Sequence, residues 1–205
     1  MKKINLITVT FFVFILTGFF HSYKQLMAVS NQQAVEEMET TDSFLDSLKN
    51  KYNYNNWAGK TIPYEGRLNS IFVPNEKWFN DYILVKSWYN TDKNLSFNHL
   101  TQVYQHVNDN NNEIWVDIKS FKDVMAAHEY LITYFSKCNA IQPFPEANIG
   151  DVGFTGYGED ENVIFCRLNF CVDINNRGET ESSVMEIAKI IDEQIINNQQ
   201  IIKSK

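Results

Sequence analysis

Three cysteines are the residues best suited to covalent chemistry, Cys138, Cys166 and Cys171. Residues 163–174 alternate between apolar and polar side chains, which predicts one continuous strand. In such a strand the Cα atoms of Cys166 and Cys171 would lie roughly 16 Å apart, and a disulfide spans at most about 7 Å. We therefore expect either a disulfide between Cys138 and one of these two cysteines, or three free thiols. The absence of a CxxC motif argues against a dithiol redox or metal site.

The histidines do not have the spacing of a metal site. His128-Glu129 matches the start of the zinc motif HExxH, but Ile132 stands where the second histidine is needed. His128 falls on the apolar face of a predicted helix, so we interpret it as a structural histidine. His99 and His106 lie seven residues apart, on opposite faces of a predicted strand. We predict neither a bound metal nor a catalytic residue from this pattern.

A long loop, residues 139–162, collects acidic and aromatic side chains beside several glycines. Its binding candidates are Asp151, Tyr157, Glu159 and Asp160. Carboxylates of this kind could bind calcium, although the spacing of an EF-hand is missing, and a solvated acidic loop is the alternative. Arg167 and Asn169, on the polar face of the following strand, are further binding candidates. Arg167 could instead pair with a carboxylate of the loop.

Aromatic residues concentrate in residues 57–115. We select Trp78, Trp88 and Trp115 as binding candidates, because exposed tryptophans are common where proteins bind a partner or a sugar. The alternative is that these residues fill a sheet, since strands favour aromatic side chains.

The elements that would position these residues alternate between helices and strands. In chain order we predict a helix over 34–52, strands over 67–73, 81–89, 95–107 and 113–118, a helix over 120–138, a strand over 163–174 and a helix over 182–197. The strand over 81–89 is apolar on both faces, which favours a central position. Ser120 is the expected helix cap, and residues 109–112 the expected turn. This order predicts an α+β fold with an antiparallel sheet of four to six strands covered by two or three helices.

Residues 118–196 resemble a C-terminal module of bacterial secreted proteins of unknown function. The resemblance rests on a helix containing 126–131, the loop opening at 149–151, a strand containing 165–169 and a closing helix containing 187–192. It implies an α+β structure and a location outside the cytoplasm, and it implies no activity.

The N-terminus predicts export. Lys2 and Lys3 precede an apolar run over residues 4–20, and no acidic residue occurs before Glu36, as in a secretory signal. Cleavage before Asn31 would leave a periplasmic or secreted chain; the alternative is an uncleaved membrane anchor over 4–20. The domain organisation we predict is a signal or anchor over 1–30, an amphipathic helix over 31–56, one α+β domain over 57–198 and a frayed tail over 199–205.

Charge narrows the class of partner. The whole chain has a net charge of -7, with 18 basic and 25 acidic residues, and residues 1–30 hold three lysines and no acid. The exported part would therefore carry -10, which disfavours nucleic acid and anionic lipid surfaces. We expect a non-catalytic protein that binds a partner protein, as an accessory subunit or inhibitor. A small-ligand or carbohydrate binder is the alternative, and a hydrolase built on a cysteine and a histidine is a third.

Overall fold

The computed structural model describes residues 41–57, 73–90, 96–138, 141–143, 148–156, 161–180 and 184–203. By its internal contacts the chain divides into two units, Met1–Ser47 and Leu48–Lys205. Residues 41–51 are helical, which agrees with the second half of the helix predicted over 34–52. Within the described ranges no helix is long and apolar enough to cross a membrane. The predicted signal or anchor, and residues 67–72 of the predicted strand over 67–73, lie outside these ranges.

In the described ranges, a seven-stranded sheet forms the centre of the second unit, and every neighbouring pair of its strands is antiparallel. The order across the sheet is β1-β2-β3-β7-β6-β5-β4. The strands are β1 (Tyr82–Asn90), β2 (Phe97–His106), β3 (Asp109–Phe121), β4 (Gln142–Pro143), β5 (Val152–Thr155), β6 (Asn162–Arg167) and β7 (Phe170–Asn176). The α+β class is confirmed, and the number of strands is one above the predicted range.

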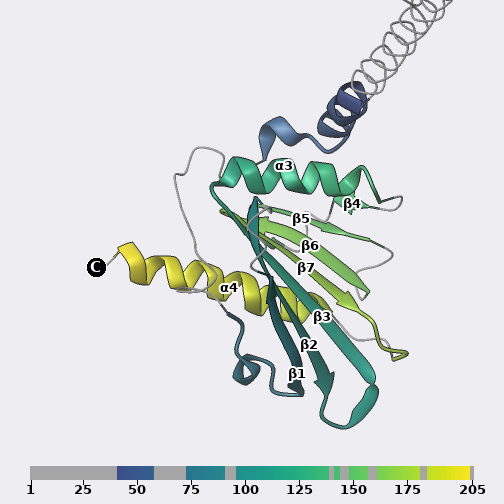
Figure 1. Cartoon of the computed structure of the whole chain (residues 1–205), viewed down its shortest axis with the longest axis vertical. Helices are drawn as coiled ribbons and strands as arrows, with labels where there is room; N and C mark the ends of the chain where they lie inside the picture. Colours follow the sequence, from purple (N-terminus) through teal and green to yellow (C-terminus); the bar gives the residue numbers. More distant parts are fainter. Residues whose placement is uncertain are drawn as a thin grey trace, which may run out of the picture. The chain divides into compact units, whose positions relative to one another are not determined.

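Two long helices lie on opposite faces of this sheet, α3 (Val124–Phe135) and α4 (Val184–Lys203) (Figure 1). α3 contacts β3, β6 and β7, and α4 contacts β6 and β7. The core on the α4 side contains inward-facing residues such as Ile118, Phe165 and Val172, together with Ile191 of α4. Two short 3-10 helices, η1 (Tyr54–Asn56) and η2 (Glu76–Trp78), precede the sheet. β6 and β7 are therefore packed between the two helices.

The strand predicted over 163–174 is wrong, because the structure folds it into a hairpin. β6 ends at Arg167, Leu168 and Asn169 form the turn, and β7 begins at Phe170. Leu168 adopts a left-handed conformation with φ of 57°, which is uncommon for a residue other than glycine. Cys166 and Cys171 become directly opposed residues in this hairpin.

Five further predictions need correction. Among the described strands, β1 is the outer strand of the sheet and not a central one. The β2–β3 turn lies at residues 107–108, before the predicted turn. Asp123 caps α3 by accepting a hydrogen bond from the Ala126 N–H, because β3 continues through Ser120. The predicted loop over 139–162 contains β4 and β5, and α4 continues to Lys203.

Candidate functional site

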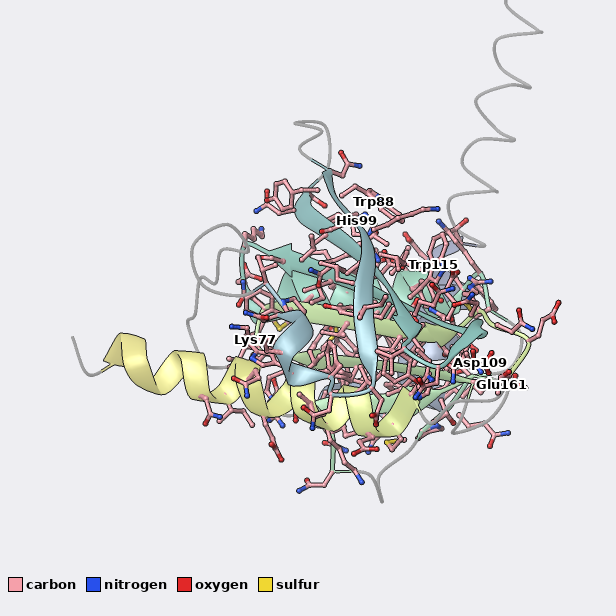
Figure 2. The ribbon with its side chains drawn as sticks, turned by 90° about the horizontal axis from the view of Figure 1, so that it is seen from below. Lys77, Trp88, His99, Asp109, Trp115 and Glu161 are labelled. Carbon is pink, nitrogen blue, oxygen red and sulfur yellow. A yellow bond between two sulfur atoms is a disulfide. The ribbon has the colours of Figure 1, made fainter. Side chains whose placement is uncertain are left out.

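The side of β1–β3 that faces away from α4 carries both exposed and buried side chains, and we call it the open face. It comprises Ile83, Lys86 and Trp88 of β1, His99, Thr101 and Val103 of β2, and Trp115 and Asp117 of β3. Ile83 and Trp88 are 49% and 43% exposed, so no helix of the described ranges shields them from solvent. α3 reaches the end of this surface, where Tyr130 contacts Phe97 and Phe121. In Figure 2, Trp88, His99 and Trp115 lie on the side of the sheet away from α4.

Two tryptophans meet on the open face, although they belong to different strands. Trp88 pairs with Thr101 in the β1–β2 register, and Trp115 pairs with Val103 in the β2–β3 register. Their rings pack edge to face, with centroids 5.7 Å apart. Val103, between Lys86 and Trp115, is almost completely buried. The tryptophan pair is thus a rigid apolar surface held in place by the strand register.

A compact hydrogen-bonded group lies beside the tryptophans. Asp117 Oδ1 lies 2.7 Å from His99 Nε2 and also accepts the Thr101 hydroxyl. Burial by itself would raise the pKa of Asp117, but the hydrogen bonds from His99 and Thr101 and the charge of Lys119 lower it overall. The Thr101 hydroxyl donates to the carboxylate and also lies 3.2 Å from His99 Nε2. An activated nucleophile would instead donate its proton to the base. This group therefore orients side chains and fixes a negative charge on the open face.

Two of the predicted binding residues, Asp151 and Arg167, join a structural cluster on the α4 side instead. Arg167 makes two hydrogen bonds of 2.7 Å to Asp192 of α4 and one of 3.1 Å to Asp151. Asp151 also accepts the Leu168 N–H, and burial raises its pKa despite these partners. The cluster joins α4 to the β6–β7 hairpin, which bears out the alternative that Arg167 pairs with a carboxylate of the loop.

The other predicted binding residues that the structure describes do not lie on the open face or in the Arg167 cluster. Asn169 is fully buried and donates to the Phe121 carbonyl, so it also acts in folding. Trp78 lies in η2, against the core on the α4 side. Tyr157, Glu159 and Asp160 lie outside the described residues. In the part of the chain that the structure describes, no three histidine, cysteine or acidic residues form a group that could hold a metal ion.

The cysteine prediction is corrected by the hairpin. Cys166 and Cys171 form a disulfide, with their Cα atoms 4.3 Å apart, and Cys138 is a free cysteine. This distance is typical of opposed residues without backbone hydrogen bonds in an antiparallel pair. Both sulfur atoms are buried beneath α3, near the Ala127 carbonyl. The disulfide therefore links β6 to β7 covalently beneath α3.

Sequence reasoning selected Trp88 and Trp115 but missed Ile83, Thr101 and Asp117. Alternation along residues 113–118 placed Trp115 and Asp117 on one face, and this was the available signal. Their contact with Trp88 and His99 depends on the register of three strands.

No protein-family model, curated protein or solved structure matches this chain.

Proposed function

We propose that this chain is an exported, non-catalytic protein that binds a partner protein through the open face. The observation that carries the proposal is the apolar surface of the open face, where Trp88 and Ile83 are exposed and Trp88 packs against the half-buried Trp115. Tryptophan dominates the energetics of many protein interfaces because a single side chain buries a large apolar area. A sheet surface also stays rigid, so a partner can bind it without first ordering it.

The polar groups of the open face favour a protein over a sugar. A sugar needs hydrogen-bonding groups beside the aromatic ring that are available to its hydroxyls. Here the Trp115 indole N–H donates to Glu113, and His99, Thr101 and Asp117 bond to one another. These four side chains therefore already make polar contacts within the protein, which leaves fewer hydrogen-bonding groups beside the tryptophans for a sugar.

Two features support export. A disulfide between Cys166 and Cys171 fits an oxidising compartment, because cytosolic proteins keep most thiols reduced. The basic and apolar N-terminus fits a secretory signal or an anchor. An acidic exported chain would attract a partner that presents basic groups around an apolar patch.

A second candidate function, small-ligand or carbohydrate binding, is favoured by one cavity. A cavity of about 340 Å³ lies beside residues 148–154, at the edge of the loop that the sequence indicated. Trp57 and Phe154 supply aromatic lining, and Asn53, Asn56 and Asn148 supply amides. Asp151 lines it as well, but its carboxylate is engaged with Arg167 and the Leu168 N–H.

The test is site-specific photocrosslinking in the native cell envelope. A benzophenone amino acid at position 88 should capture one stoichiometric partner protein, and the same group at Met125 serves as the control. Met125 is apolar and 41% exposed, but it lies on α3. With the purified partner, Ile83→Ser should raise the dissociation constant about tenfold or more, and Met125→Ser should leave it unchanged. Equal capture from both positions, or equal effects of both substitutions, would contradict the proposal.

A further inference from the structure

A second cavity lies on the other side of the sheet from the open face. It has a volume of about 260 Å³, is open to solvent and is lined by η2, the start of β1, the ends of β2 and β3 and the first turns of α4. Pockets for drug-sized ligands measure about 300–1,000 Å³, so this cavity suits a smaller molecule. Nothing in the proposed partner-binding function uses it.

Aromatic side chains line this cavity. Trp78 and Tyr82 line it and are partly buried. Phe79 also lines it and is almost fully buried. The Phe79 ring packs edge to face on Tyr104, with ring centroids 4.8 Å apart. The Tyr82 ring is held by a hydrogen bond from its hydroxyl to Asn112 and by an edge contact with His106. Aromatic rings held in this way present fixed negative ring faces, which attract cations.

Two acidic side chains line the cavity. They are those of Asp81 and Glu186, both exposed residues; the His106 imidazole also lines the cavity, and among its described lining residues there is no lysine or arginine. Lys77 neighbours Trp78 in η2 (Figure 2) but does not line the cavity. Ile187 and Ile190 of α4 add an apolar wall. The cavity thus offers carboxylates, aromatic rings and an apolar wall, which match the two ends of an alkylammonium compound.

We propose that this cavity binds a small organic cation, an alkylammonium group with a short apolar chain. The ammonium lies among Trp78, Tyr82, Asp81 and Glu186, and the alkyl chain contacts Phe79 and Ile187. The net negative charge of the chain raises the local concentration of such cations. The ammonium comes either from a free amine or from a lysine side chain of a peptide.

The test is a calorimetric titration of the purified exported chain with n-butylammonium chloride. We expect a dissociation constant of about 1 mM or lower, and binding of the neutral n-butanol at least about tenfold weaker. Nα-acetyllysine methylamide separates the two sources, because tighter binding than butylammonium assigns the site to lysine side chains and weaker binding assigns it to free amines. Equal affinity for butanol, or no heat with any of the three compounds, overturns the proposal.

Matched substitutions locate the site. Glu186→Gln and Asp81→Asn should each raise the dissociation constant for butylammonium about threefold. Glu193→Gln makes the same change of charge on an exposed position of α4 that does not line the cavity, and it should have no effect. A negative charge in the first turn also stabilises a helix, so the unfolding temperature of each variant is measured alongside. An equal effect of Glu193→Gln and Glu186→Gln overturns the assignment to this cavity.

Discussion

The two halves of the sheet differ in how their faces are covered. In β6 and β7, α4 packs on one face and α3 on the other, and a disulfide joins the two strands. In β1–β3, one face joins the core on the α4 side, while the other carries exposed Trp88 and Ile83. Apolar side chains of β6 and β7 therefore stabilise the fold, whereas Trp88 and Ile83 remain accessible to solvent.

Phe165→Ala should give the largest loss of stability. Phe165 of β6 is fully buried in the core on the α4 side. Removing its ring leaves a cavity that the surrounding side chains fill incompletely, at a cost of about 4 kcal/mol in the free energy of unfolding. Urea denaturation followed by circular dichroism measures this loss. A cost below about 1 kcal/mol would show that the two halves do not differ as described.

Arg167→Met should have the next largest effect, again in the helix-covered half. The substitution keeps the length of the side chain but leaves the carboxylates of Asp192 and Asp151 without their shared cation. Leaving a buried charge unpaired typically costs about 3 kcal/mol. Denaturation at neutral pH measures the loss, and the triple variant with Asp151→Asn and Asp192→Asn should recover part of it. If the triple variant recovers nothing, the ion pairs are not the cause.

His99→Leu probes the hydrogen-bonded group of the open face, because a leucine side chain cannot donate a hydrogen bond to Asp117. The lowered pKa of Asp117 means that its ionised form stabilises the fold above the unfolded pKa, and that this stability disappears as the pH falls through the folded pKa. Removing the His99 hydrogen bond should therefore cost about 1 kcal/mol at pH 7 and nothing near pH 2. Denaturation curves at the two pH values make the comparison. A constant difference would show that Asp117 is not the linked group.

Ile83→Ser should have the smallest effect on stability, about 0.5 kcal/mol or less, because half of the side chain is exposed. Its effect on partner binding should be large, as described above. A small effect of Ile83→Ser on stability together with a large effect on binding would distinguish the open face from the helix-covered half of the sheet. A stability loss as large as that of Phe165→Ala would place Ile83 in the core.

The general architecture could be predicted from the sequence, whereas the turn within residues 163–174 could not. Both faces of β6 and β7 are covered, so apolar residues occupy both faces and the alternation does not stop at Leu168. The turn also lacks glycine and proline, and Leu168 takes a conformation that its side chain disfavours. The disulfide followed from this turn and was therefore missed too.

The sequence indicated some residues of the candidate site, but it did not show which of them lie together in the structure. Trp88 and Trp115 were selected, yet their contact depends on the β2–β3 turn, which falls before the predicted residues. A shift of one residue would have placed one tryptophan on the opposite face. Arg167 and Asn169 were selected because they are polar. In the structure their polar groups bond to Asp192 and Phe121, which lie 25 and 48 residues away in the sequence.

Among the described strands β1 ends the sheet, and its irregular register affects how the protein behaves at high concentration. An exposed strand edge can add strands from other molecules and grow into fibrils. In β1 the register shifts between Leu84 and Lys86, which interrupts the regular row of backbone groups, and Lys86 adds a positive charge at that point. Irregular, charged edges of this kind resist such polymerisation. The chain can therefore display tryptophans on the surface of a sheet while its edge discourages self-assembly.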